Sequence, residues 1–408
     1  MPRHVVFLGP DLFSAYLEMV RGLKRAGARV TAIGHTSRGR LDRRLLRYVD
    51  DYIRIASLLD AGKVLQIVRE IDRRVPVDQI ETGDENLVLT CAQVREILEV
   101  PGLSIRSAQL CRDKPAMKDA LRSAGVPTAA SAAVDSLQAL HEFAEREGFP
   151  LILKPRSALG SLGTHRVENT SELEAAGRAL HVNRGKSAAV EEFVEGHEGF
   201  YDTLTVEGEP VHDFISHYYP NVLGALRDRK VSPQIAVTNR IDRDSYEELQ
   251  EMGRKVIQTL GISTSATHME WFFGPKGLKF SEIAARPPGE RIWDLYSAAN
   301  EMDVWTEWAM VMVHHRAAGR PSRRFATGSV QVRPDRDGRI LGYSRVAEVW
   351  RTIRPWVFEH RLPPQGTPTD PVHKGYYNNV WFRLRHPDYD SLRELMSYVG
   401  ATLRVHAG

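Results

Sequence analysis

Cysteine is scarce in this chain, and long apolar runs are missing from it. The 408 residues include 2 cysteines, Cys91 and Cys111, whose spacing matches no metal-binding pattern. A disulfide framework or a zinc site is therefore not expected. No stretch approaches the roughly 18 consecutive apolar residues of a membrane-spanning helix. The start, MPRHVVFLGPDLF, holds too short an apolar run for a signal peptide. We expect a cytoplasmic protein with no membrane partner.

The chain also lacks an excess of one charge sign. It has 55 basic and 52 acidic residues and a net charge of +3, which gives little reason to expect a nucleic-acid partner. With 42% apolar and 26% charged residues, the composition is typical of a globular protein. The length allows two or three domains.

Strand and helix patterns alternate in the first hundred residues, which predicts a small parallel sheet with helices on both faces. Gly9-Pro10 lacks the three-glycine spacing of a dinucleotide-binding turn, so bound NAD is not expected. Asp84 and Glu85 follow the fourth strand, where they either cap a helix or contact a substrate amine. The expected strands are His4–Leu8, Arg29–Ile33, Tyr52–Ile55 and Gln79–Thr82, and the expected helices are Phe13–Ala26 and a segment around Gly62–Arg74.

Two glutamates lie in apolar surroundings on a predicted strand pair, 266–273 and 278–284, joined by the turn Gly274-Pro275-Lys276-Gly277. A charge buried there must be neutralised, paired or bound to a cation. Glu270 and Glu282, followed by Arg286, would make a seat for Mg²⁺ and a polyphosphate. Alternatively, both glutamates face the surface and Arg286 is their salt-bridge partner.

A glycine-bearing loop follows the predicted strand 150–154. Lys154 ends that strand, and the loop contains Gly160, Ser161 and Gly163 before the strand 165–167. Backbone N–H groups of such a loop can bind phosphate oxygens while the lysine neutralises their charge. By itself this predicts only a possible phosphate site.

The order of these motifs resembles the ATP-grasp superfamily, in particular its carboxylate–amine ligases of the L-amino-acid-ligase and biotin-carboxylase-like types. The resemblance covers roughly residues 110–300 and rests on Lys114, the 154–163 loop, the segment 191–198, the two glutamates and Arg286. It implies an α/β (α+β) ATP-grasp fold with four parts: an N-terminal Rossmann-like domain at 1–105, a small subdomain with the glycine loop at 106–186, a central domain with the metal site at 187–318, and a β-rich subdomain at 319–408.

The resemblance also implies residue roles. Lys114 and Lys154 would contact ATP phosphates, and the Gly160–Gly163 loop would close over them. Glu270 and Glu282 would hold Mg²⁺ or Mn²⁺, and Arg286 would steady the transferred phosphoryl group. The adenine and ribose contacts would come from Glu191, Glu192, Phe193, Val194 and Glu198.

Two positions depart from the family pattern. Ala284 stands where the family usually has an asparagine that binds metal, and Pro287-Pro288-Gly289 follows the arginine in place of two glycines. The lost ligand could be replaced by water, could weaken one of two metal sites, or could mark a nucleotide-binding protein without ligase turnover.

Substrate selection is expected between the nucleotide hinge and the metal strands. A loop at 217–221 and 227–230 would present His217 and Tyr219 to a carboxylate, unless it is only a solvated surface loop. Arg291 could meet a substrate acid or pair with Asp294. A final small sheet is expected at 328–333, 339–343, 378–383 and 400–405, with Tyr376, Tyr377 and Trp381 packing it against the core.

The expected function is an ATP- and Mg²⁺-dependent ligase that joins a small carboxylate to an amine, such as that of an amino acid, through an acylphosphate. Release of ADP and phosphate would accompany the reaction. A bicarbonate-dependent carboxylase of the same fold is the alternative enzyme. The family resemblance makes a homodimer a further expectation, with the N-terminal sheet as a candidate surface.

Overall fold

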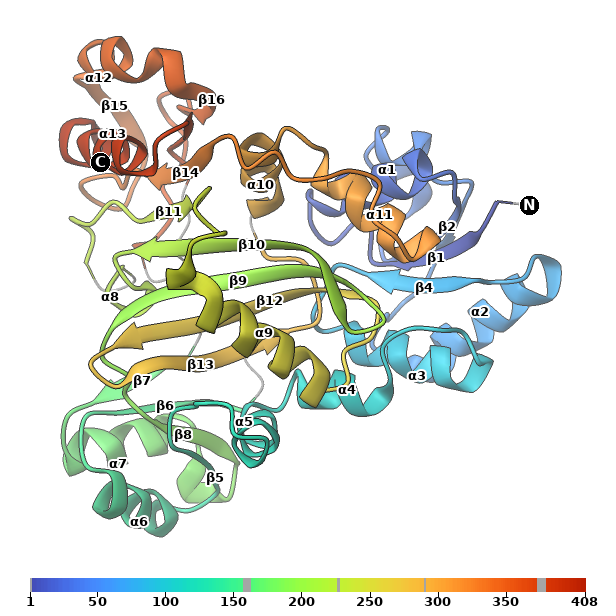
Figure 1. Ribbon diagram of the computed structural model, residues 1–408, viewed down its shortest axis with the longest axis horizontal. Helices are drawn as coiled ribbons and strands as arrows, with labels where there is room; N and C mark the ends of the chain where they lie inside the picture. The colour runs from blue at the N-terminus through green and yellow to red at the C-terminus, as the bar shows by residue number, and fades with distance from the viewer. Residues whose placement is uncertain (1, 157–162, 226–227, 290, 373–378) are drawn as a thin grey trace.

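The computed structural model describes residues 2–156, 163–225, 228–289, 291–372 and 379–408. It begins with a parallel four-stranded sheet of order β3-β2-β1-β4 (Figure 1). Val5 and Phe7 of β1 point to the core that holds helix α1, whereas Val6 and Leu8 point to the opposite core. This alternation places helices on both faces, as the sequence predicts. The elements are β1 His4–Leu8, α1 Tyr16–Arg25, β2 Arg29–Gly34, β3 Asp51–Arg54, α2 Ala61–Arg74, β4 Gln79–Thr82 and α3 Val88–Leu98.

A second four-stranded sheet, of order β5-β8-β6-β7, packs helices α6 and α7 against one face (lower left in Figure 1). Leu151 and Leu153 of β6 pack against α6 and α7 in an apolar core. Because strand side chains alternate, Ile152 and Lys154 lie on the other face, where Glu191 of β8 is the register partner of Ile152. The elements are β5 Ser131–Val134, α6 Leu137–Glu147, β6 Leu151–Pro155, β7 His165–Val167, α7 Thr170–Ala179 and β8 Ala188–Glu192.

The centre of the molecule is an eight-stranded antiparallel sheet of order β13-β12-β9-β10-β11-β14-β17-β16. Phe200 of β9 belongs to the core on the side of α10 and α11, whereas Tyr201 packs in the core that contains α9 residues. The predicted glutamate-bearing strand pair is confirmed as β12 and β13. The elements are β9 His197–Val206, β10 Glu209–Tyr219, β11 Gln234–Val237, α9 Glu247–Thr259, β12 Ser265–Gly274, β13 Gly277–Ala284, α10 Ile292–Asn300, α11 Val304–His314, β14 Ala326–Gln331, β16 Val357–Arg361 and β17 Trp381–His386.

The C-terminal residues do not form one small sheet of their own: β15 and β18 pair as a separate two-stranded sheet. Three other strands of this region extend the central sheet, because β14 pairs directly with β11. The strand expected at 400–405 is wrong in part, since helix α13 runs to Thr402 and only the last residues are extended. Asp388 caps this helix, and Leu392, Met396 and Val399 are buried at helical spacing. The remaining elements here are β15 Ile340–Ser344, α12 Val346–Ile353, α13 Tyr389–Thr402 and β18 Arg404–Ala407; Tyr376 and Tyr377 lie outside the described residues.

Two short helices connect the larger elements. Helix α4 (Ile105–Leu110) follows α3, and Ser104 caps it by accepting a hydrogen bond from the Ser107 N–H. The expected loop at 217–221 is wrong for its first residues, since β10 continues to Tyr219 and pairs there with β11. A short helix, α8 (Val222–Ala225), follows.

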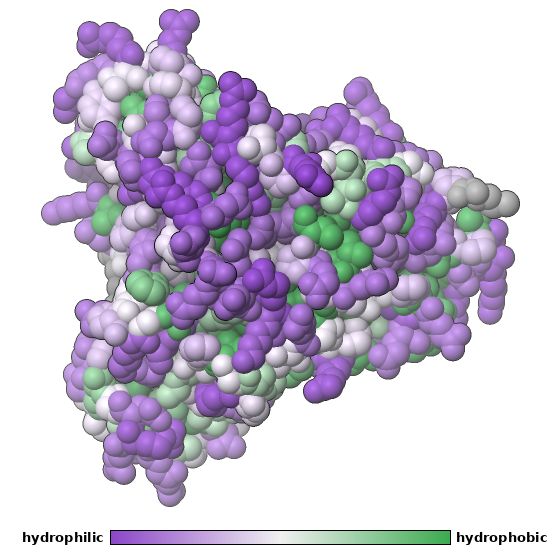
Figure 2. Space-filling view, viewed as in Figure 1, coloured by the Kyte–Doolittle hydropathy of each residue, from purple (hydrophilic) through white to green (hydrophobic). Residues whose placement is uncertain are grey.

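Hydrophilic residues cover most of the face seen in Figure 2, and hydrophobic residues reach that surface only in small groups. In the part of the chain that the structure describes, no helix combines the length and apolar character needed to cross a membrane.

Candidate active site

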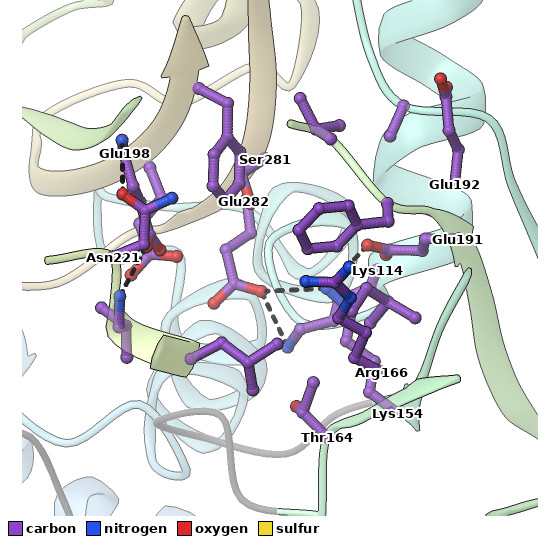
Figure 3. Close-up of a pocket in the computed structure, with 18 of the residues that line it drawn as sticks. Lys114, Lys154, Thr164, Arg166, Glu191, Glu192, Glu198, Asn221, Ser281 and Glu282 are labelled. Carbon is purple, nitrogen blue, oxygen red and sulfur yellow. Dashed lines mark hydrogen bonds and ion pairs between the residues drawn. The ribbon is translucent and has the colours of Figure 1, made fainter. Parts of the chain in front are cut away.

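A cavity of about 330 Å³ opens between one end of the central sheet and the face of the small sheet opposite α6 and α7 (Figure 3). Side chains from both sheets and from helix α5 (Lys114–Ser123) line it. Most of the residues that the sequence assigns to nucleotide and metal therefore meet in one place. Its predicted lining residues are Lys114, Lys154, Glu191, Glu192, Phe193, Val194, Glu198, Glu270 and Glu282.

Two lysines share one glutamate oxygen at the inner end of the cavity. The Nζ atoms of Lys118 and Lys154 lie 2.8 and 2.9 Å from Oε2 of Glu191. Burial opposes ionisation of Glu191, but the charges of Lys118 and Lys154 outweigh it and lower its pKa to about 2. Burial lowers the pKa of Lys118 to about 8, against the opposing charge of Glu191. For Lys154 the carboxylates Glu191 and Glu282 outweigh burial and raise the pKa.

The two strand glutamates are direct register partners, and a β-bulge follows Glu270. Glu282 Oε2 lies 3.3 Å from Lys114 Nζ and 3.9 Å from Lys154 Nζ, so these three groups converge, as Figure 3 shows. Although burial opposes it, the charges of Lys114 and Lys154 lower the pKa of Glu282. Burial and the negative charges of Glu282 and Glu198 raise the pKa of Glu270 to about 8.

This donor set fits a magnesium ion. Two carboxylates on adjacent strands are hard oxygen ligands, and a cation between them would relieve the repulsion that raises the pKa of Glu270. Within the described ranges, no group of three or more His, Cys, Asp or Glu side chains is placed to hold a metal ion. A magnesium ion here would therefore need phosphate or water oxygens as further ligands, which is its usual coordination in phosphoryl-transfer sites.

The hinge segment at the end of β8 is held by charged contacts. Glu192 pairs with Lys276 in the β12–β13 turn, and its carboxylate accepts a 3.3 Å hydrogen bond from the Ala130 N–H. In Figure 3 the side chain of Glu192 points away from Lys114 and Lys154, so only its backbone faces the predicted adenine position. The Arg166 guanidinium lies over the Phe193 ring, 4.2 Å from its centroid.

Glu198, the predicted ribose ligand, lies across the cavity beside Asn221 (Figure 3). Its Oε2 accepts a 2.7 Å hydrogen bond from the Val222 N–H. Burial raises its pKa to about 7, with a further contribution from the charge of Glu282. Of the predicted glycine loop, Gly163 adopts φ +73°, which favours glycine, whereas Gly160 and Ser161 lie outside the described residues.

Arg286 does not line the cavity but joins the N-terminal domain to the central sheet. Its Nε and Nη2 atoms donate to Glu85 Oε2 at 3.0 and 2.8 Å. Arg112 donates to the other oxygen of Glu85 at 3.1 Å. Asp84 accepts a hydrogen bond from the Asn86 N–H, so of the two acids after β4 one caps the following turn and the other binds arginine.

The three predicted substrate residues lie outside the cavity. His217 is buried, with ring nitrogens 2.9 Å from His197 Nε2 and 2.8 Å from the Tyr246 hydroxyl. The Tyr219 hydroxyl lies 3.1 Å from that of Tyr389. Arg291 donates to Asp294 at 2.5 Å, which is the alternative that the sequence left open. Contact of these residues with a substrate stays a prediction.

Several charged groups near the site are not evident from the motifs. Lys118 lines the cavity, and its spacing of four residues from Lys114 on one helix is a signal that could have revealed it. The Nδ1–H of His268, two residues before Glu270, donates to Asp202 Oδ1 at 2.7 Å, and the other oxygen of Asp202 accepts a 2.5 Å hydrogen bond from the Tyr296 hydroxyl. Asp202 and Tyr296 come from separate elements, so their contact leaves no local sequence signal.

The fold and this constellation define an ATP-grasp protein. The chain belongs to the ATP-grasp family: the model of the ATP-grasp domain matches residues 119–299, and that of the ATP-grasp N-terminal domain matches residues 21–102. ATP-grasp enzymes bind ATP and a divalent metal, which agrees with the expected ligands of this cavity.

Among its relatives, the chain is 22% identical over 367 residues to an L-arginine-specific L-amino acid ligase of Bacillus subtilis, covering 88% of this chain and 87% of that protein. It is 26% identical over 233 residues to the alanine–anticapsin ligase of Bacillus subtilis (strain 168), but that match spans only 48% of the relative. A crystal structure of an L-amino acid ligase from Bacillus licheniformis has the same fold, with a TM-score of 0.78 at 17% identity over 100% of this chain and 99% of that one.

Proposed function

We propose that this protein is an ATP-dependent carboxylate–amine ligase that activates a small carboxylic acid as its acylphosphate. The observation that carries the proposal is the convergence of Lys114 and Lys154 with Glu270 and Glu282 in one cavity. Phosphoryl transfer requires mainly positioning and charge neutralisation, which lysines and metal-binding carboxylates supply. The names of the amino acid ligases among the relatives support an amino acid as one substrate.

The nucleotide would enter with its base at the hinge and its phosphates at the lysines. Oε1 of Glu191 is buried and has no hydrogen-bond partner among the described residues. A buried carboxylate oxygen without a donor is costly, so it favours a ligand that brings an N–H group. The exocyclic amine of adenine would supply that donor, while the Glu192 carbonyl and the Val194 amide would bind the base edge and Glu198 the ribose hydroxyls.

The chemistry would proceed in two steps. A substrate carboxylate oxygen attacks the γ-phosphorus of ATP, forming the acylphosphate and releasing ADP. The amine nitrogen then attacks the acyl carbon, loses a proton and expels inorganic phosphate, so that an amide bond forms. Lys114 and Lys154 hold the phosphate oxygens, and Glu270 and Glu282 hold Mg²⁺ or Mn²⁺. When bound, the metal ion neutralises phosphate charge.

Arg286 is the group we assign to the transferred phosphoryl. It lies beyond the glutamate pair, where it meets Glu85 at the carboxyl end of the N-terminal parallel strands. Ligands of open α/β sheets bind outside the carboxyl ends of their strands. This placement supports entry of the acid and the amine between the N-terminal domain and the metal-binding strands.

The test is release of ADP and phosphate from ATP and Mg²⁺ in the presence of amino acids and small carboxylic acids, given singly and in pairs. We expect release that requires an acid together with an amine and that is absent with GTP. Bicarbonate in a separate assay provides the comparison with a carboxylase. Stimulation by bicarbonate alone, or ATP binding without stimulation by any pair, would contradict the ligase.

A further inference from the structure

Lys118 is a buried lysine that the nucleotide-binding assignments leave without a role. Its side chain is 1% exposed, and it projects from α5 into the inner end of the cavity. Its ion pair with Glu191 is the only one formed by Lys118 within the described ranges. A buried lysine loses hydration and side-chain freedom, so its position needs a compensating interaction.

The two carboxylate oxygens of Glu191 differ in their contacts. Oε2 accepts from both Lys118 and Lys154, whereas Oε1 is buried and has no partner among the described residues. Lys154 lies between Glu191 and Glu282, so it also faces the predicted phosphate position. Lys118 has no such second carboxylate within ion-pair distance in the described part of the chain, and it is free to act on Glu191 alone.

From this arrangement we infer that Lys118 is a positioning residue that sets the choice of nucleobase. By holding Oε2, it directs Oε1 of Glu191 toward the edge of the bound base, which selects a base with an exocyclic amino group. A purine with a carbonyl at that position would place two acceptor oxygens together, which costs binding energy. The inference rests on the proposed nucleotide site and adds to it the residue that makes the site selective.

Isothermal titration of ADP and of IDP, each with Mg²⁺, tests this on the full-length protein without any acid or amine. Hypoxanthine has a carbonyl in place of the amino group of adenine and also a proton on N1. The change in the ratio of the two dissociation constants between Lys118 variants therefore measures the contribution of Lys118 to the selectivity. We expect the wild-type protein to prefer ADP by about tenfold or more, the value of one hydrogen bond to a charged group. Lys118→Met should reduce that preference at least threefold, and Lys118→Arg, which keeps the charge and a donor, should restore most of it.

The control is Lys186→Met, the same substitution at an exposed lysine before β8, which should leave the ratio unchanged. Glu191→Gln gives an independent measurement if Lys118→Met does not fold. Its amide can donate to a carbonyl oxygen, so binding of IDP should improve relative to ADP.

An unchanged ratio in Lys118→Met, or in Glu191→Gln when the methionine variant does not fold, would overturn the inference. Equal wild-type affinity for ADP and IDP would overturn it and leave the ligase proposal standing. Binding of neither nucleotide would instead refute the nucleotide site itself.

Discussion

Two charged clusters flank the predicted path of phosphoryl transfer, and they are built differently. The cluster around Glu191 uses lysines and is almost closed to solvent, with side-chain exposures of 1% for Lys118 and 12% for Lys154. The cluster around Glu85 uses arginines, with exposures of 21% for Arg112 and 20% for Arg286, and it joins the N-terminal parallel sheet to the central sheet.

The difference follows from the chemistry of the two cations. A lysine is a point charge whose pKa shifts when it is buried, as that of Lys118 does. An arginine stays charged and presents a planar fork to a carboxylate, so it suits a junction where two domains meet. The lysine cluster is thus suited to a fixed pocket for nucleotide, and the arginine cluster to a site where substrates enter.

Removal of a carboxylate next to the lysine cluster should have the largest effect. In Glu282→Ala, Lys114 and Lys154 lose a shared partner and the predicted metal site loses half of its protein ligands. We expect ADP release to fall by about 10²- to 10³-fold or more, and Lys154→Ala should behave similarly. Circular dichroism should show an intact fold, and the exposed Glu168→Ala serves as control. An active Glu282→Ala protein would refute the metal assignment.

Arg286→Lys tests whether the second cluster needs the arginine fork. Lysine keeps the charge but cannot make both contacts to Glu85 Oε2 at 3.0 and 2.8 Å. We expect kcat to fall by about 10²-fold with the KM for ATP little changed, because the arginine lies outside the nucleotide cavity. Steady-state kinetics separate the two parameters, and a change confined to the KM for ATP would contradict this division.

Glu85→Gln should weaken the junction between the domains. The amide can still accept from one arginine, but the buried charge pairs with Arg112 and Arg286 are lost. We expect the free energy of unfolding to fall by about 1–3 kcal/mol, measured by urea denaturation. High salt should reduce the difference in the free energy of unfolding between variant and wild type only slightly, because these charged groups are mostly buried. Equal stability at low salt would argue against a structural role for the pair.

Lys118→Met should change how the free energy of unfolding depends on pH. The pKa of Lys118 is about 8 in the folded protein and 10.5 ordinarily, so the unfolded chain binds more protons between these values. The wild-type free energy of unfolding should therefore rise between pH 8 and 10.5 relative to that of Lys118→Met, and the two curves should run parallel just below pH 8. If the two curves stayed parallel above pH 8, the pKa of Lys118 would not be lowered in the folded protein.

The smallest effect is expected from Ala284→Asn, which places an amide oxygen near the metal-binding strands. Ala284 is 8% exposed and is the register partner of His268. If the site has only lost a ligand, the Mg²⁺ concentration for half-maximal ADP release should fall by about two- to fivefold. An unchanged magnesium titration would count against that explanation.

Local patterns were sufficient for much of the fold. Strands such as β1 and β4 and helices such as α2 carry their periodicity and capping residues within a few positions, and their predicted bounds agree with the structure. Lys114 was assigned from the resemblance to the ATP-grasp superfamily, and Lys154 from its place at the end of a strand before a glycine-bearing loop. The structure brings both to one cavity with the predicted glutamates.

Contacts between distant segments were beyond such patterns. The pairing of β11 with β14 joins residues such as Ala236 and Gly328, whose register depends on the whole sheet. The extension of β10 through His217 and Tyr219 was hidden because polar and aromatic residues next to Pro220 are typical of a loop. Similarly, the sequence around Arg286 gives no sign that its partner is Glu85, because that residue is 201 positions away in the chain.

The extension of the central sheet by β14, β17 and β16 also bears on the order in which the chain can fold during synthesis. The parallel sheet is complete once Thr82 has left the ribosome. The edge of β11, by contrast, lacks its neighbour until residue 331 has been made, and β14 in turn lacks β17 until residue 386. An exposed strand edge is prone to pairing with other chains, so nascent chains stalled between these points should be the form of this protein that aggregates most readily and depends most on chaperones.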